Sequence, residues 1–124
     1  MFDLGADIAT PGDDFEPSEM VLRIVPAQVD RLERELDAMN DTLAPLRSFV
    51  LPAGNGGAGE IHLARAITRR AERTAVALAA AEPVNPAALA YLNRLSDYLF
   101  ISARFVNQSG SGDVLWGPGA SRQD

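Results

Sequence analysis

Four arginines fall within nine consecutive positions, at Arg65, Arg69, Arg70 and Arg73, although the 124-residue chain carries a formal net charge of −6. Residues four apart share one face of an α-helix, so Arg65, Arg69 and Arg73 are expected to form a stripe roughly 12 Å long. Like charges at this spacing repel one another unless something anionic lies against them. Guanidinium forks suit phosphate oxygens, so two interpretations are open: a solvated or interface surface whose charges are paired by Glu72 and neighbouring acids, or a polyphosphate site.

A second pair of polar residues lies further along the chain, where Asn93 and Asp97 are four residues apart. On a helix they share a face, and polar groups that face other helices need partners. Two interpretations stay open. Asp97 pairs with an arginine of the preceding helix, or Asn93 contacts a sugar or base edge while Asp97 orients an arginine.

The elements that must position these residues are three long helices, each with apolar residues at intervals of three and four. The first begins near Pro26 and carries its stripe to Leu43. The second runs from about Glu60 to Ala81, and the third from Asn85-Pro86 to about Asn107. The expected apolar side of the second comprises Leu63, Ala66, Ile67, Ala71, Thr74 and Leu78.

The remaining segments are read as connections around one all-α, up-and-down bundle that occupies residues 1–124 as a single domain. Residues 2–9 resemble the end of an element, 10–20 a loop, and 109–124 a tail anchored by Trp116. The glycine-rich stretch Gly54–Gly59 lacks the Lys-Ser/Thr ending of a phosphate loop, so it is expected to be a flexible connection. Three helices bury a thin core, which predicts a fourth element or self-association.

Composition excludes several classes of site. The chain has no cysteine, and its single histidine, His62, is expected to be structural, so neither disulfides nor a metal site built from protein ligands is predicted. The acidic balance argues against nucleic acid as the main partner. No apolar run is long enough to cross a bilayer, and no signal peptide is evident, so a cytoplasmic protein is expected.

Several segments, in this order and spacing, resemble the PduO-type ATP:cob(I)alamin adenosyltransferases. They are residues 2–11 (FDLGADIATP), 46–52 (LRSFVLP), 62–73 (HLARAITRRAER), 84–97 (VNPAALAYLNRLSD) and 112–116 (GDVLW). The resemblance implies a five-helix bundle, a homotrimer with active sites between subunits, and transfer of the 5′-deoxyadenosyl group of ATP to cob(I)alamin with release of triphosphate. It also implies Mg²⁺ and a reductase that delivers the cobalt(II) corrinoid.

The same resemblance assigns roles to residues of this chain. Phe49 would lie under the corrin ring and displace the lower axial ligand of cobalt, and Arg69 would assist the chemical step. Arg65 would form a salt bridge between subunits, and Asp97 would hold the local polar network. The ATP site would comprise Arg69, Arg70, Glu72, Arg73 and Asn93.

The chain departs from the family at its beginning, where the family's threonine- and glycine-rich ATP loop and the helices that follow it are expected but absent. The sequence is therefore expected to carry about two-thirds of the family's length. Two other functions stay open: a non-catalytic, trimeric helical assembly module, and a nucleotide-binding bundle that lacks a complete active site.

Overall fold

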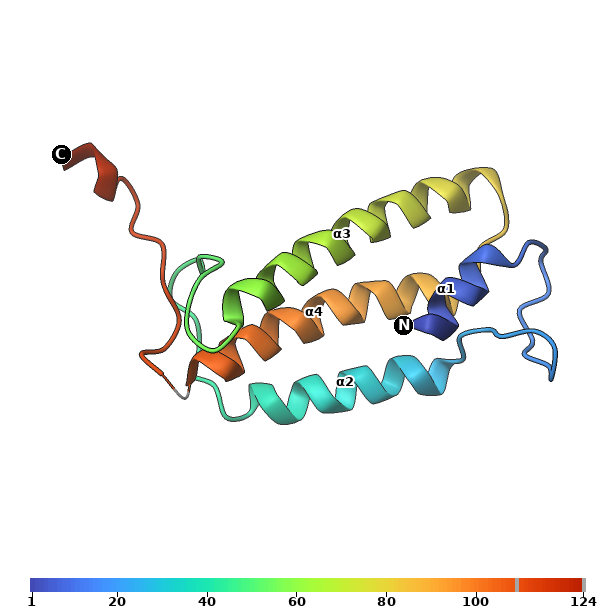
Figure 1. Cartoon of the computed structure of the whole chain (residues 1–124), viewed down its shortest axis with the longest axis horizontal. Helices are drawn as coiled ribbons and strands as arrows, with labels where there is room; N and C mark the ends of the chain where they lie inside the picture. The colour runs from blue at the N-terminus through green and yellow to red at the C-terminus, as the bar shows by residue number, and fades with distance from the viewer. Residues whose placement is uncertain (109, 124) are drawn as a thin grey trace.

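Three long helices run side by side in the computed structural model, which describes residues 1–108 and 110–123. They are α2 (Pro26–Asn40), α3 (Ala58–Ala81) and α4 (Pro86–Gln108), and successive helices run in opposite directions with α4 packed against both others (Figure 1). The shorter α1 (Phe2–Ala9) contacts α4, and a 3₁₀ turn, η1 (Ala120–Gln123), lies in the tail. The all-α, up-and-down prediction is confirmed. Residues 109 and 124 of the predicted tail lie outside the described residues.

Local chemistry fixes most helix ends where the sequence predicted them. Pro26 occupies the first turn of α2, where its missing N–H costs nothing, and the Gln28 side chain accepts a hydrogen bond from the Val25 N–H at 2.9 Å. Asn85 caps α4, because its side-chain oxygen accepts the Ala87 N–H at 3.1 Å. Helix α2 ends at Asn40, earlier than its apolar pattern predicted.

A buried polar network fastens α1, the segment before α2 and the start of α4 together. The Asp7 carboxylate is 1% exposed and forms an ion pair with Arg23, in which Nη1 lies 2.9 Å from Oδ1. Its other oxygen accepts hydrogen bonds from the Ile24 N–H at 2.6 Å and from the Asn85 side chain at 2.8 Å. Residues 2–9 therefore form a short helix that is anchored in the bundle by a charged group.

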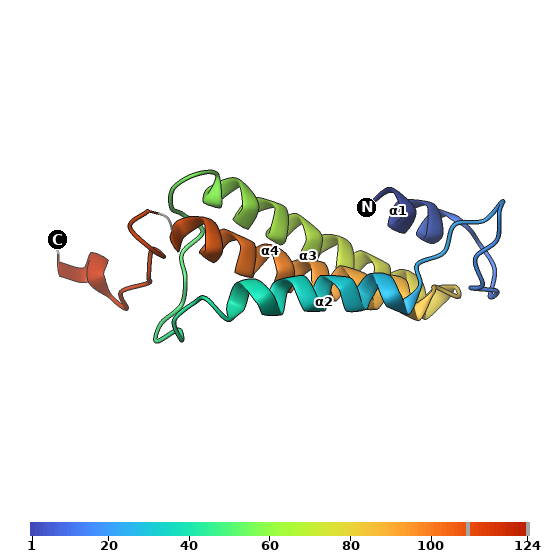
Figure 2. The same cartoon turned by 90° about the horizontal axis from the view of Figure 1, so that it is seen from below.

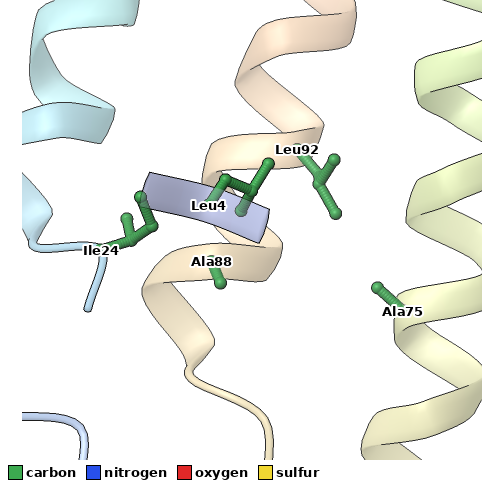
Figure 3. Packing of buried hydrophobic residues seen from close by; sticks show 5 residues of the cluster. All are labelled: Leu4, Ile24, Ala75, Ala88 and Leu92. Carbon is green, nitrogen blue, oxygen red and sulfur yellow. The ribbon is translucent and has the colours of Figure 1, made fainter. Parts of the chain in front are cut away.

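The apolar core lies beside this network. Figure 3 shows Leu4 of α1 drawn over α4 near Ala88, between Ile24 and Leu92, with Ala75 facing them from α3. The residues are small or medium in size, which lets the helices approach closely. The loop between α2 and α3 and the tail after α4 lie at the opposite end of the bundle from the α1–α4 contact (Figures 1 and 2).

The predicted apolar side of α3 is wrong. Leu63 and Ile67 are 61% and 48% exposed, and Ala66, Ala71 and Thr74 are exposed as well. The side of α3 that is buried instead carries Ala58, His62, Thr68 and Ala75. Small residues there permit close contact with α4, so the larger apolar side chains stay uncovered.

Candidate functional site

The four arginines lie along α3 as their spacing predicts. Arg69, Arg70 and Arg73 are exposed, and Arg65 is half-buried. Across residues 1–108 and 110–123, none of the four forms an ion pair, so the expected pairing with Glu72 and neighbouring acids is wrong. A solvated or interface surface and a polyphosphate site both stay open. An uncompensated cationic surface of this kind attracts anions.

Glu72 is turned to a different partner. The Asn93 side chain of α4 donates a hydrogen bond from Nδ2 to the Glu72 carboxylate at 3.0 Å and accepts one from Arg94 at 3.2 Å. This contact joins α3 to α4 beside the arginines. The hydrogen bond uses one of the two Glu72 carboxylate oxygens.

Asp97 does not form the predicted ion pair with an arginine of α3. Its carboxylate lies 3.6 Å from Arg94 of its own helix, and Arg94 also pairs with Glu33 of α2 at 3.4 Å. The negative charge of Asp97 still affects Arg65 of α3. Burial and the neighbouring Arg69 lower the pKa of Arg65, and Asp97 acts to raise it.

An apolar cavity of about 350 Å³ begins at Arg65 and extends toward the end of the bundle. The ring of Phe100 lines it, and the Arg65 guanidinium lies over this ring at 4.7 Å from the centroid. Phe49, which is 75% exposed, lines the cavity from the loop between α2 and α3. The lining residues are Leu46, Ser48, Phe49, Val50, Arg65 and Phe100.

His62 lies behind this cavity and has a structural environment. Its side chain is 6% exposed and meets the edge of Phe100, with ring centroids 6.2 Å apart. Burial and then Arg65 lower the pKa of His62, while Asp113 acts to raise it. The imidazole is therefore neutral near pH 7, which agrees with the structural role that the sequence predicted.

The glycine-rich loop differs from the flexible connection that was predicted. The fully buried Asn107 side chain accepts the Asn55 N–H at 2.8 Å and donates to the Ala53 carbonyl at 3.1 Å. Between them, Gly54 has a φ of +138°, and a Cβ there would collide with the Asn107 amide. The loop is thus fastened to α4 at a position that requires glycine.

Sequence reasoning also missed Arg104, which is buried near the end of α4 and pairs with Asp113 at 2.8 Å. The sequence shows an arginine near the end of the helix, but neither its burial nor its partner follows from the local residues. Within the described residues, no group of three or more His, Cys, Asp or Glu side chains is arranged to hold a metal ion. In the same part of the chain no helix combines the length and apolarity needed to span a bilayer.

Comparison with known proteins assigns a family to this arrangement. The sequence model described as "Cobalamin adenosyltransferase" matches residues 1–106, which is most of the chain. This protein belongs to the cobalamin adenosyltransferase family. A corrinoid adenosyltransferase of Mycobacterium tuberculosis is 48% identical over 124 residues, and one of Bacillus subtilis is 44% identical over 117 residues. These alignments cover 98% and 92% of this chain, and 63% and 57% of the two relatives.

Solved structures of family members share the fold. A phenylalanine-to-alanine variant of a PduO-type ATP:corrinoid adenosyltransferase from Lactobacillus reuteri, complexed with cobalamin and ATP, matches with a TM-score of 0.78 and 39% identity. An arginine-to-lysine variant, complexed with ATP, matches with a TM-score of 0.80 and 36% identity. The matches cover 93% and 94% of this chain and 63% and 64% of those chains. This cobalamin adenosyltransferase homologue thus spans somewhat less than two-thirds of the relatives it matches.

Proposed function

We propose that this family member transfers the 5′-deoxyadenosyl group of ATP to cob(I)alamin and releases triphosphate. One observation carries the proposal, the closeness of two different surfaces. Arg65 and Phe49 line an apolar cavity. One helical turn beyond Arg65, the exposed arginines begin with Arg69, and they form no ion pairs in the described chain. A site for a polyphosphate therefore adjoins a site for a flat, hydrophobic ring system. The Lactobacillus reuteri relative complexed with cobalamin and ATP supports this pairing of ligands.

The arginines match the charge changes of the proposed reaction. Cobalt(I) supplies an electron pair to C5′ of ATP, a cobalt–carbon bond forms, and the C5′–O bond breaks with its electrons passing to the departing triphosphate. Cations held in place before the reaction stabilise such developing charge without reorganisation. We assign this role to Arg69 as the group nearest the chemical step, with Arg70 and Arg73 holding the phosphate chain.

The polar groups beside the arginines suit the rest of the nucleotide. Asn93 would contact the nucleoside, and its hydrogen bond to Glu72 would fix the orientation of both side chains. Mg²⁺ usually binds substrate phosphates together with one or two carboxylates and several waters. Glu72 can provide one such carboxylate, and a Mg²⁺ ion bound with ATP would neutralise part of the phosphate charge.

The apolar cavity suits the corrinoid. Phe49 would lie against the lower face of the ring and exclude a lower axial ligand from cobalt, which eases reduction of cobalt(II) to cobalt(I). Arg65 would form a salt bridge across a subunit interface. Its Nε is buried without a hydrogen bond among the described residues. Asp97 acts to raise the pKa of Arg65, which opposes the lowering by Arg69. A homotrimer, a partner reductase and a cytoplasmic location belong to the same proposal.

The proposal is tested by adenosylcobalamin formation from ATP and chemically reduced cobalamin, followed by absorbance. We expect Arg69→Ala to lower kcat by roughly 10²–10³-fold, the usual loss when one preorganised donor is removed. Arg69→Lys should recover part of this loss, since it restores charge without the planar fork. Arg31→Met is the matched control, because Arg31 is an exposed arginine of α2 that pairs with Glu35.

Equal rates for Arg69→Ala and the control would overturn the assigned role. ATP turnover that needs no corrinoid would indicate another nucleotide-dependent transferase. Calorimetric titration with Mg-ATP separates the catalytic proposal from a non-catalytic assembly module. The module predicts a folded bundle that binds neither ATP nor corrinoid.

A further inference from the structure

Two segments far apart in the sequence pair with each other at the end of the bundle. The loop that carries Phe49 forms an isolated antiparallel bridge with the tail, between Val50 and Leu115. The rings of Phe49 and Trp116 meet edge to face, with centroids 5.8 Å apart and planes at 61°. Three hydrogen bonds join the segments: Leu51 N–H to the Val114 carbonyl at 2.7 Å, Trp116 N–H to the Phe49 carbonyl at 2.8 Å, and the Ser48 hydroxyl to the Trp116 carbonyl at 2.8 Å.

Burial does not hold this aromatic pair in place. Phe49 is 75% exposed and Trp116 is 45% exposed. An isolated pair of short strands is marginally stable in water, so three hydrogen bonds and one ring contact are insufficient by themselves. A further anchor to the helical bundle is therefore required if the cavity wall is to have a fixed position.

Asn107 holds the loop at Ala53 and Asn55. Arg104 of α4 provides a further anchor, whose guanidinium contacts both segments. Nε donates to the Asp113 carboxylate at 2.8 Å, at the base of the tail. Nη2 donates to the Ala44 carbonyl at 2.8 Å, at the base of the loop. The side chains of Arg104 and Asp113 are 7% and 14% exposed, so water competes weakly for this charge-assisted hydrogen bond.

The geometry points to Arg104 as a positioning residue that fixes the Phe49–Trp116 pair, so that Phe49 is a preformed wall of the corrinoid cavity. This role rests on the proposed function, since it assigns a purpose to the cavity that Phe49 lines. Arg104 acts through the loop and the tail and is not placed against the substrate. A wall that is ordered before binding spares the complex the entropic cost of ordering it.

We call the contacts of Arg104 with Asp113 and Ala44 the clamp. Trp116 reports on the clamp directly, because it is the single tryptophan of the sequence. The variants are Arg104→Met, which removes both hydrogen bonds, and Asp113→Asn, which removes the charge on the tail and leaves the bond to Ala44 in place. Arg31→Met again serves as the matched loss of an arginine far from the tail. Circular dichroism of each variant checks that the helices are retained, and Asp113→Asn keeps the test informative if Arg104→Met does not fold.

We expect the emission of Trp116 to shift to the red and to be quenched more readily by acrylamide in both clamp variants, and to be unchanged in Arg31→Met. Corrinoids absorb where tryptophan emits, so titration with cob(II)alamin in the presence of Mg-ATP gives the affinity from the same signal. The affinity should fall by roughly tenfold in Asp113→Asn, as expected when one charge-assisted hydrogen bond is lost.

The outcomes distinguish failure of the positioning role of Arg104 from failure of the proposed adenosyl transfer to a corrinoid. Unchanged emission and unchanged cob(II)alamin affinity in both clamp variants would overturn the role of Arg104 and leave the proposed function standing. Altered emission in the clamp variants of a chain that does not bind cob(II)alamin would overturn the corrinoid site and support Arg104 as the residue that positions the aromatic pair.

Discussion

Arg65 connects the two parts of the candidate site at the scale of single residues. Its guanidinium lies over Phe100, which lines the apolar cavity, and the next turn of α3 begins the exposed arginines with Arg69. Burial is the first cause of its lowered pKa and the charge of Arg69 is the second, since like charges one helical turn apart repel. An anion bound at Arg69 would relieve this repulsion, so substrate binding and the position of Arg65 are expected to be coupled.

His62 gives a prediction about pH. Its pKa in the folded chain is below the ordinary value of 6.5, so the unfolded chain takes up a proton first as the pH falls. The contribution of the neutral imidazole to the free energy of unfolding is therefore fully present above about pH 6.5. It is lost as the pH falls toward the pKa that His62 has in the folded chain. We expect His62→Leu, which has no titrating group, to lose less stability than the wild type between pH 7 and pH 5.5.

Urea unfolding at a series of pH values measures this difference, and carboxylates that titrate in both proteins cancel in the comparison. The groups that act on His62 are Arg65 on α3 and Asp113 in the tail, which act in opposite directions. Parallel stability curves for wild type and His62→Leu would show that folding does not lower the pKa of His62.

At the scale of elements, the short helix α1 depends on one buried carboxylate. Asp7→Asn would leave the Arg23 guanidinium, which is 3% exposed, without its counter-charge. Removing one partner of a buried ion pair typically costs about 3–5 kcal/mol, a large share of the stability of a domain of this size. We expect the midpoint of urea unfolding, followed by circular dichroism, to fall accordingly.

The surface pair Arg31–Glu35, with side chains 74% and 42% exposed, provides the comparison. Arg31→Met is expected to change the free energy of unfolding by less than about 1 kcal/mol. If Asp7→Asn were no more destabilising than Arg31→Met, the network would not be what fastens α1.

The ends of the helices could be predicted from sequence because local residues determine them. Pro26, Asn85 and the Glu82-Pro83 stop each act within one turn, and all three lie at the observed ends. The buried face of α3 could not be predicted from apolar periodicity. Periodicity locates Leu63 and Ile67, but it does not state whether another element covers them, and the contact with α4 uses Ala58 and Ala75 instead.

The residues of the candidate site also differ in whether nearby sequence could predict them. The arginine face followed from spacing alone, and the importance of Phe49 came from the resemblance to the family. Arg104 reaches the Ala44 carbonyl across 60 positions of sequence, and no local pattern marks such a contact. Its role required the fold.

At the scale of the whole molecule, the uncovered side of α3 is the feature with the largest consequence. Leu63 and Ile67 are exposed, and a groove of about 510 Å³ lies between α1 and α3, lined mainly by apolar groups with Arg70 among them. Contiguous apolar surfaces of this kind usually mark contacts with other proteins. Because the groove adjoins the arginine face, a protein that covered it would also border the proposed ATP site.

We expect the chain to self-associate through this surface, and the homotrimer included in the proposed function is the expected stoichiometry. The double variant Leu63→Glu with Ile67→Glu places charges on the exposed side of α3, where they do not disturb the contact with α4, and should shift the protein to the monomer. Leu22→Glu, at a residue 53% exposed in the loop before α2, is the matched control and should keep the wild-type mass. Light scattering across a range of protein concentrations measures the mass of each. A wild-type monomer at all concentrations, or a double variant with the wild-type oligomer mass, would show that this surface is not where the subunits meet.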